Sequence, residues 1–179
     1  MSDTGRSIGF AIIVAVVCSF LLTAAAAGLK PLQERNMRVD RQKNILKSVG
    51  LIDDPKSISV DQIERLYAET IRCLEVDGTG NLVADTAGED ALPVCFYIQE
   101  KQPSAYILPV NSRGLWGKIH GYMAIQEDGE TIAGFSVYSH NETPGLGGEI
   151  EKPWFQNNFV GKKIVDANGD FTPVAIAKG

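Results

Sequence analysis

The sequence contains few of the side chains that usually carry nucleophilic or metal chemistry. Among its 179 residues there are three cysteines and two histidines. It has no Walker-type phosphate loop, no GxGxxG, no CxxC pair, no HExxH helix and no serine nucleophile elbow. The acidic stretch from Asp77 to Asp90 lacks the alternating Asp and Asn spacing of a calcium loop. We therefore expect no catalytic side chain and no metal site.

A surplus of basic residues is also lacking. The formal net charge is −5, which argues against nucleic acid as a partner because nucleic-acid binding requires a basic surface. A hydrophobic content of 44% is nevertheless sufficient for the packed core of one ordinary domain.

The three cysteines are distributed unevenly. Cys18 lies in an apolar run, which leaves Cys73 and Cys95 for the folded domain. These two could form a disulfide in an oxidising compartment. Because neither a CxxC spacing nor a neighbouring histidine indicates a dedicated role, we favour two ordinary buried thiols.

The longest uncharged stretch runs from Ile8 to Leu29. As a helix, its 22 residues would extend about 33 Å, which is enough to span a bilayer. A cleaved signal peptide is the alternative, because residues 24–27 resemble a small-residue cleavage region. The run is longer than a typical signal-peptide core, so a retained transmembrane anchor is favoured. More basic residues follow the run than precede it, and this count by itself favours a domain in the cytoplasm.

Helical patterns follow the anchor. A stalk is predicted up to Gly50, interrupted only by Pro31, where a kink or fresh start is as expected as a continuous helix. A second helix is predicted to begin at residues 57–61, because Ser59 and Gln62 form a capping box. Its apolar stripe consists of Ile63, Leu66, Tyr67 and Ile71.

From Val94 onward the periodicity is that of β-strands. Asp128-Gly129 is the clearest hairpin signal, Pro153 favours the first turn of a short helix within residues 152–159, and Asn168-Gly169 favours a turn between two final strands. The predicted fold class is α+β, with an N-terminal transmembrane helix and then a single domain of antiparallel sheet packed with helices. The predicted strands are residues 94–98, 105–110, 122–126, 131–139, 162–166 and 171–177.

The stretch from His140 to Gly148, which reads His-Asn-Glu-Thr-Pro-Gly-Leu-Gly-Gly, is the first candidate for a binding site. Pro144 fixes its own φ, whereas the glycines permit positive φ and a close approach of ligand to backbone. A plain chain reversal remains the alternative. Trp116 lies between glycines and either caps the edge of the core, which we favour from the pattern alone, or walls a site for a flat aromatic ligand.

Several separated motifs give the chain a family resemblance. They are the apolar anchor, Arg41 to Leu51, Gly114-Leu115-Trp116-Gly117, His140 to Gly148 and Trp154 to Gly161. In this order they resemble the C subunit of the sodium-translocating NADH:quinone reductase over nearly the whole chain. The resemblance implies a flavoprotein subunit of a respiratory sodium pump, which passes electrons from NADH toward quinone through FMN, coupled to sodium export. The FMN-binding residues that it implies are Trp116, His140, Glu142, Thr143, Gly145, Leu146 and Gly147.

The resemblance also implies an organisation and a location. Residues 1–30 would be the transmembrane anchor, 31–50 a helical stalk and 51–179 an extracytoplasmic FMN-binding-type domain. The domain would lie in the periplasm at the bacterial inner membrane, contrary to the positive-inside count. Residues 8–29 would contact lipid, and the other proteins of the pump would be the partners.

The C-terminal region departs from the family pattern. Family members carry FMN on a threonine within a Ser-Gly-Ala-Thr-type motif, and this sequence has no such motif. We therefore expect a domain that is incomplete at its C-terminus and a chain that is inactive alone. Two alternatives stay open: the G subunit of the related ion-translocating ferredoxin:NAD reductase, which shares mainly the Glu-Thr-Pro-Gly-Leu-Gly part, and a non-redox, membrane-tethered interaction domain.

The family pattern leads to a hypothesis about contacts. Glu142, Thr143 and the glycine amides would hydrogen-bond the flavin or its ribityl phosphate, whereas Leu146 and Trp116 would offer apolar surface to the ring. An electron carrier of this kind needs no acid or base of its own, because the flavin performs the redox chemistry.

Overall fold

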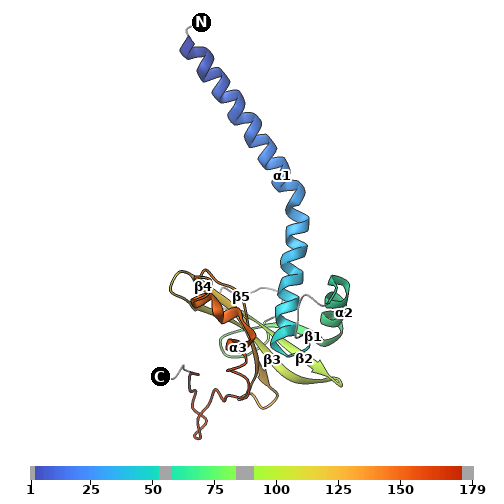
Figure 1. The fold of residues 1–179 in the computed structure, drawn as a ribbon. Coiled ribbons are helices and arrows are strands. Elements are labelled where there is room, and N and C mark those ends of the chain that lie inside the picture. The colour runs from blue at the N-terminus through green and yellow to red at the C-terminus, as the bar shows by residue number, and fades with distance from the viewer. Residues whose placement is uncertain (1–2, 53–57, 84–90, 175–179) are drawn as a thin grey trace. The chain divides into compact units, whose positions relative to one another are not determined.

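The computed structural model of the protein describes residues 3–52, 58–83 and 91–174 (Figure 1). The chain divides into two compact units, Met1–Arg38 and Val39–Gly179. The predicted fold class, an N-terminal apolar helix followed by an antiparallel sheet packed with helices, is confirmed. The finer division at residues 30 and 50 stays a prediction.

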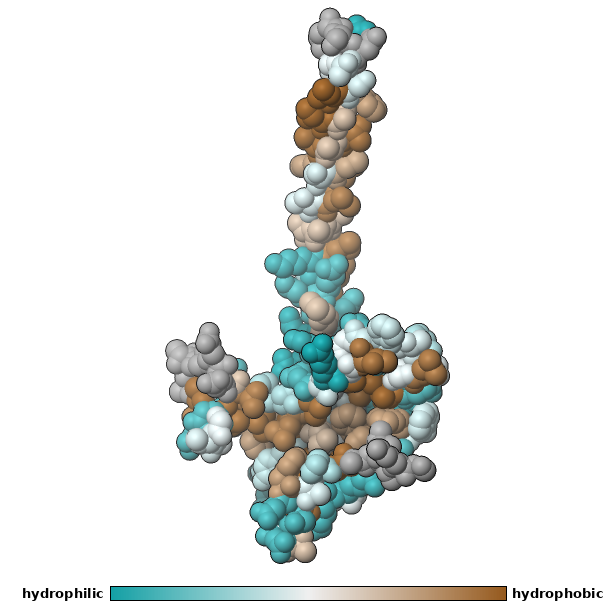
Figure 2. Space-filling view, turned by 90° about the vertical axis from the view of Figure 1, so that its left-hand side faces the viewer, coloured by the Kyte–Doolittle hydropathy of each residue, from teal (hydrophilic) through white to brown (hydrophobic). Residues whose placement is uncertain are grey.

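The N-terminal unit consists of one helix. Helix α1 (Asp3–Ser48) runs without a break through Pro31, so the continuous helix is the observed alternative. Between Thr4 and Ser48 this helix is long and apolar enough to cross a membrane. Figure 2 shows apolar side chains along its N-terminal part and polar side chains after them.

The last turns of α1 belong to the C-terminal unit and enter its core. Ile45 and Leu46 are completely buried. The helix ends before Gly50, whose φ of 71° is readily adopted only by glycine. The Leu51 N–H donates to the Leu46 carbonyl oxygen at 3.0 Å, which satisfies one of the last free carbonyl groups of the helix.

A five-stranded antiparallel meander forms the centre of the C-terminal unit, in the order β1-β2-β3-β4-β5 (Figure 1). Strands β2 to β5 correspond to four predicted runs: β2, β3 and β4 are longer than predicted, and β5 begins one residue later. Strand β1 was not predicted. The bounds are β1 Ile71–Val76, β2 Leu92–Gln99, β3 Gln102–Arg113, β4 Lys118–Gln126 and β5 Ile132–Ser139.

Helix α2 (Val60–Thr70) precedes β1. The predicted capping box is confirmed, because the Ser59 side chain accepts from the Gln62 N–H and the Gln62 side chain accepts from the Ser59 N–H. Ile71, predicted on the helical stripe, instead begins β1. The predicted start at Ser57 lies outside the described residues.

The core lies on the face of the sheet that receives α2 and the end of α1. Gly134 packs so closely on the Ser48 carbonyl oxygen that a Cβ there would collide with it. Ser136 Oγ donates to the Asn44 carbonyl oxygen at 3.0 Å. On the opposite face, next to helix α3 (Pro153–Gln156), the rings of Phe135 and Phe159 lie 4.7 Å apart.

The expectation of two ordinary buried thiols is wrong. Cys73 and Cys95 form a disulfide. They are direct partners in the antiparallel pair of β1 and β2, and the pairing could not be anticipated because β1 was missed. Cys18 is a free cysteine.

The prediction of two final strands, residues 162–166 and 171–177, also needs correction. Among the described residues after 160 there are only single bridges, Thr131 with Lys163 and Val165 with Phe171, around a turn at Asn168-Gly169. Residues 162–164 pair briefly with the backbone around the β4–β5 turn before the chain turns away, so no ladder develops. The end of the second predicted strand, residues 175–177, lies outside the described residues.

Candidate functional site

Two loops lie together where neighbouring strands end. We call this end of the strands the loop edge of the sheet. Residues 114–117 connect β3 to β4, which pair up to Arg113 and Lys118. Residues 140–148 follow β5, which pairs with β4 up to Ser139 and His120. The Gly114 N–H donates to the Gly117 carbonyl oxygen at 2.7 Å and closes the first loop. The topology therefore brings the two candidate motifs together.

Glu142 joins the two loops. Its Oε1 accepts a hydrogen bond from the Trp116 N–H at 3.0 Å. A Cβ at Gly114 would collide with the same carboxylate, and a Cβ at Gly147 would lie 2.8 Å from Glu142 Oε2. These glycines are therefore required by close packing around a carboxylate, whereas Gly145 is required by its φ of 74°.

The second loop has its own backbone hydrogen bonds. The carbonyl oxygen of Thr143 accepts from the N–H groups of Leu146 at 3.1 Å and Gly148 at 3.0 Å. A short 3₁₀ helix, η1 (Gly147–Glu151), follows directly. His140 begins the loop, and its Nδ1 accepts from the Glu142 N–H at 3.1 Å. The loop is thus a formed structure with its Thr143 side exposed.

Large apolar side chains project from both loops. Trp116 is 68% exposed, Leu115 82% and Leu146 73%. The expectation that Trp116 caps the core is therefore wrong, because the contact of its backbone with Glu142 leaves the indole outside. A pair of exposed apolar loop tips at one edge is typical of a surface that binds another molecule.

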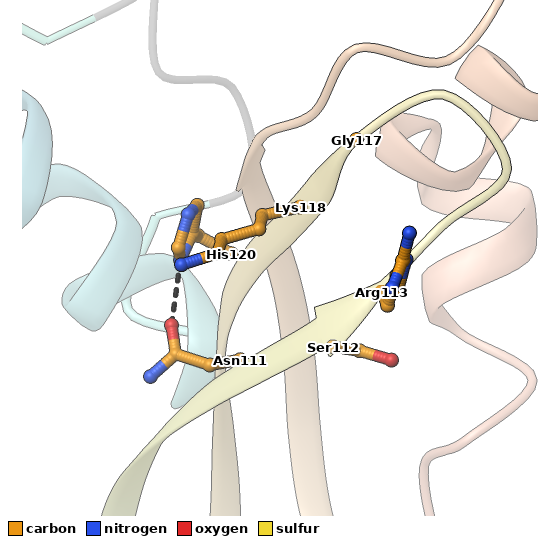
Figure 3. A pocket seen from close by; sticks show the side chains of 6 residues that line it. All are labelled: Asn111, Ser112, Arg113, Gly117, Lys118 and His120. Atoms are coloured by element: carbon orange, nitrogen blue, oxygen red, sulfur yellow. Dashed lines mark hydrogen bonds between the residues drawn. The ribbon is translucent and has the colours of Figure 1, made fainter.

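A hollow of about 650 Å³ lies beside the first loop (Figure 3). It is lined by Asn111, Ser112, Arg113, Gly117, Lys118 and His120. No carboxylate lines it, and within the described part of the chain neither Arg113 nor Lys118 has an ion-pair partner. In a chain with a net charge of −5, this hollow is a local basic surface that favours an anion.

The sequence motifs located the loops but not all of the residues that build them. The structure brings Trp116 next to Glu142 and places Thr143 and Leu146 on the exposed side. Sequence reasoning missed Asn141, which packs against Gly117, and the basic residues of the hollow. Had residues 113–118 been predicted as a hairpin, Arg113 and Lys118 would have been expected opposite each other.

Comparison with known proteins assigns the region that contains both loops. A family model described as the FMN-binding domain matches residues 114–175. The chain is 35% identical to the C subunit of the Na(+)-translocating NADH-quinone reductase of Pseudomonas aeruginosa, over 99% of this chain and 78% of that protein. It is 36% identical to the C subunit of the same reductase from Neisseria meningitidis serogroup B, over 87% and 70%.

Solved structures show the same relationship. A crystal structure of the C subunit from Parabacteroides distasonis is 34% identical and superposes with a TM-score of 0.73, over 84% of this chain and 77% of that chain. NqrC from Shewanella oneidensis, at 21% identity, shares the fold with a TM-score of 0.68 over 83% and 79%. The chain therefore belongs to the family of the C subunit of the Na(+)-translocating NADH-quinone reductase, and it contains the FMN-binding domain of that family.

Proposed function

We propose that this chain is the FMN-binding subunit of a respiratory sodium pump and that the loops 114–117 and 140–148 contact the FMN. Electrons from NADH would pass through this FMN toward quinone, coupled to sodium export. The observation that supports the proposal best is the pair of exposed apolar side chains, Trp116 and Leu146, on two loops that Glu142 ties together inside the FMN-binding domain.

The residues present fit the chemistry of FMN. A flat isoalloxazine ring requires apolar surface with a few polar groups placed around it, and its phosphate is an anion. Trp116 and Leu146 provide the apolar surface, and the exposed Thr143 provides a hydroxyl. Arg113 and Lys118 line the adjacent hollow and provide positive charge for the phosphate end.

Bound FMN would supply the electron transfer, and the protein would supply position and polarity. Trp116 and Leu146 would cover the ring and exclude water from it. Glu142 already accepts the Trp116 N–H, so its main role would be to hold the tryptophan loop in place. The N–H groups of Gly145 and Gly147 would donate to flavin oxygens, as close approach to glycine backbone permits.

We further propose that the domain of residues 51–179 lies in the periplasm, with residues 1–30 as a single inner-membrane anchor and residues 31–50 as its stalk. The disulfide between Cys73 and Cys95 supports this orientation, because disulfides persist in oxidising compartments and are rare in the cytoplasm. Residues 8–29 would contact lipid, and the other proteins of the pump would be the partners.

FMN binding by the full chain in detergent tests the proposal. Titration of FMN, followed by quenching of flavin fluorescence, should show saturable binding. Trp116→Ala should weaken it about tenfold, the effect of losing roughly 1.4 kcal/mol of ring contact. Trp154→Ala is the matched control, because this second tryptophan is 60% exposed but lies outside both loops. Absence of binding by the unaltered chain, or equal weakening by both variants, would overturn the proposal and favour a non-redox tethered domain.

Riboflavin separates the phosphate contact from the ring contact. Riboflavin has the same ring but no phosphate, so neutralising the hollow should not change its affinity. The double change Arg113→Gln and Lys118→Gln should weaken FMN severalfold and should do so most at low salt. Equal weakening of FMN and riboflavin would contradict a role of these two cations at the phosphate.

A further inference from the structure

Glu151, at the end of η1, faces the first residue of the loop 140–148. Its Oε2 lies 3.5 Å from His140 Nε2. The His140 side chain is only 14% exposed, whereas the Glu151 side chain is 55% exposed, so the imidazole is shielded from water and the carboxylate is not. On the other side of the same ring, Nδ1 accepts from the Glu142 N–H at 3.1 Å. One imidazole thus connects η1 to the residue that holds the tryptophan loop.

The two contacts fix the positions of the ring protons. A backbone N–H can only donate, so His140 Nδ1 must present its lone pair to Glu142. A neutral imidazole carries one proton, and that proton must then be on Nε2, the nitrogen that lies 3.5 Å from Glu151 Oε2. The arrangement is therefore consistent with a single tautomer.

Other charged groups surround this pair. Within η1 and the residue after it, Lys152 Nζ lies 4.0 Å from Glu151 Oε1, and Glu149 is engaged with Trp154 Nε1 at 3.4 Å. From the last turn of α1, Lys47 is attracted to Glu151. Burial lowers the pKa of Lys47, and the Glu151 carboxylate opposes that shift. The Glu151 carboxylate thus has a lysine from each of two elements near it.

We propose that Glu151 is a positioning residue, which holds His140 in the Nε2–H tautomer and so keeps Nδ1 available to the Glu142 N–H. Glu142 in turn holds Trp116 by its backbone. Four residues therefore set the relative position of the two loops: Glu151, His140, Glu142 and Trp116. In this arrangement His140 is an acceptor for the loop backbone rather than a contact of the flavin.

The chain contains an internal reference for this inference. His120 is the only other histidine. Its Nδ1 lies 2.6 Å from Asn111 Oδ1, an atom that can only accept, so His120 carries its proton on Nδ1. The two histidines are therefore expected in opposite tautomers.

Nitrogen NMR of the ¹⁵N-histidine-labelled full chain in detergent, without flavin, tests the proposal. Near neutral pH the unaltered chain should show one Nε2–H ring and one Nδ1–H ring, and His120→Gln assigns them. Glu151→Ala removes one of the two contacts that favour Nε2–H, so part of the His140 population should shift to Nδ1–H. Glu151→Gln, whose amide oxygen still accepts, should restore Nε2–H, and Glu149→Ala should change nothing. Nδ1–H at His140, or an unchanged ring in Glu151→Ala, would overturn the proposal.

The consequence for flavin rests on the proposed function and is measured separately. Glu151→Ala should weaken FMN binding about tenfold, because a loop that is less ordered before binding must be ordered on binding, and Glu151→Gln should restore it. If the unaltered chain binds no FMN but shows the expected tautomers, the proposed function fails and the positioning role stands. If Glu151→Ala binds FMN normally and keeps its tautomer, the positioning role fails.

Discussion

The middle of the sheet and its loop edge are built from the same three strands in different ways. In the middle, Ile107, Ala124 and Gly134 are aligned across β3, β4 and β5 and are buried next to the end of α1. At the edge, the chain continues into Trp116 and Leu146, both of which are exposed. A few residues along each strand separate a dry core from an open surface.

The two regions are held in place by different kinds of interaction. The middle is ordered by burial of apolar area, which contributes roughly 25 cal/mol per Å² and needs no ligand. The edge is ordered by the hydrogen bond from the Trp116 N–H to Glu142 and by glycines that let two loops approach each other. A region of this second kind has lower local stability, which is typical of binding loops.

The largest loss of stability is expected from a substitution in the middle of the sheet. Ile107→Ala should lower the free energy of unfolding by about 2–5 kcal/mol, because it removes a fully buried side chain and leaves a cavity. Leu146→Ala, at the edge, should change it by less than about 0.5 kcal/mol. Urea unfolding of the full chain in detergent measures both. Equal losses would show that the edge is part of the core.

The disulfide stabilises the far side of the same sheet. Replacement of Cys73 and Cys95 by serine should lower the free energy of unfolding by about 3 kcal/mol, the magnitude expected for a closed loop of this size. Added reductant should produce the same loss in the unaltered chain and none in the variant. Because β1 is remote from β5 in the strand order, FMN affinity should hardly change.

A smaller loss of stability is expected from a substitution at the loop edge. Glu142→Ala should lower the free energy of unfolding by about 1–2 kcal/mol, since it removes the half-buried, charged acceptor of the Trp116 N–H. The sharper measurement is hydrogen exchange of the Trp116 amide, which should become faster in Glu142→Ala and remain slower in Glu142→Gln. Unchanged exchange in Glu142→Ala would show that the contact does not hold the loop.

The smallest effect concerns the opposite end of the β4–β5 hairpin. Hydrogen bonds from the Thr131 hydroxyl and N–H and from the Glu130 N–H lower the pKa of Asp128 to about 2. The folded pKa is below the unfolded value of about 3.9, so the contribution is present above about pH 4 and is lost as pH falls toward about 2. The stability difference between the unaltered chain and Asp128→Asn should shrink over that window in acid unfolding measurements, whereas a pH-independent difference would contradict the assignment.

The elements that sequence alone could locate depend on local interactions. The Asp128-Gly129 turn and the Ser59–Gln62 capping box are satisfied within a few residues, and both were predicted. Strand β1 was missed because the helical stripe extended to Ile71 and because its partner strand begins only at Leu92, after a long polar stretch of sequence. The disulfide was misjudged for the same reason.

At the site, too, features that depend on local interactions could be predicted, and features that depend on contacts distant in sequence could not. The glycine and proline content of residues 140–148 indicated a binding loop, because those residues act locally. The exposure of Trp116 could not be predicted, since it depends on a hydrogen bond to Glu142, 26 residues away. The pairing of His140 with Glu151 likewise depends on how η1 folds back after the loop.

Amide chemical shifts of the full chain in detergent, recorded with and without FMN, test most directly whether the loop edge is the flavin surface. The changes should be concentrated in the loops 114–117 and 140–148, with little change at Ile107 or in β1. Saturable FMN binding with the largest changes outside these two loops would contradict the assignment of the site.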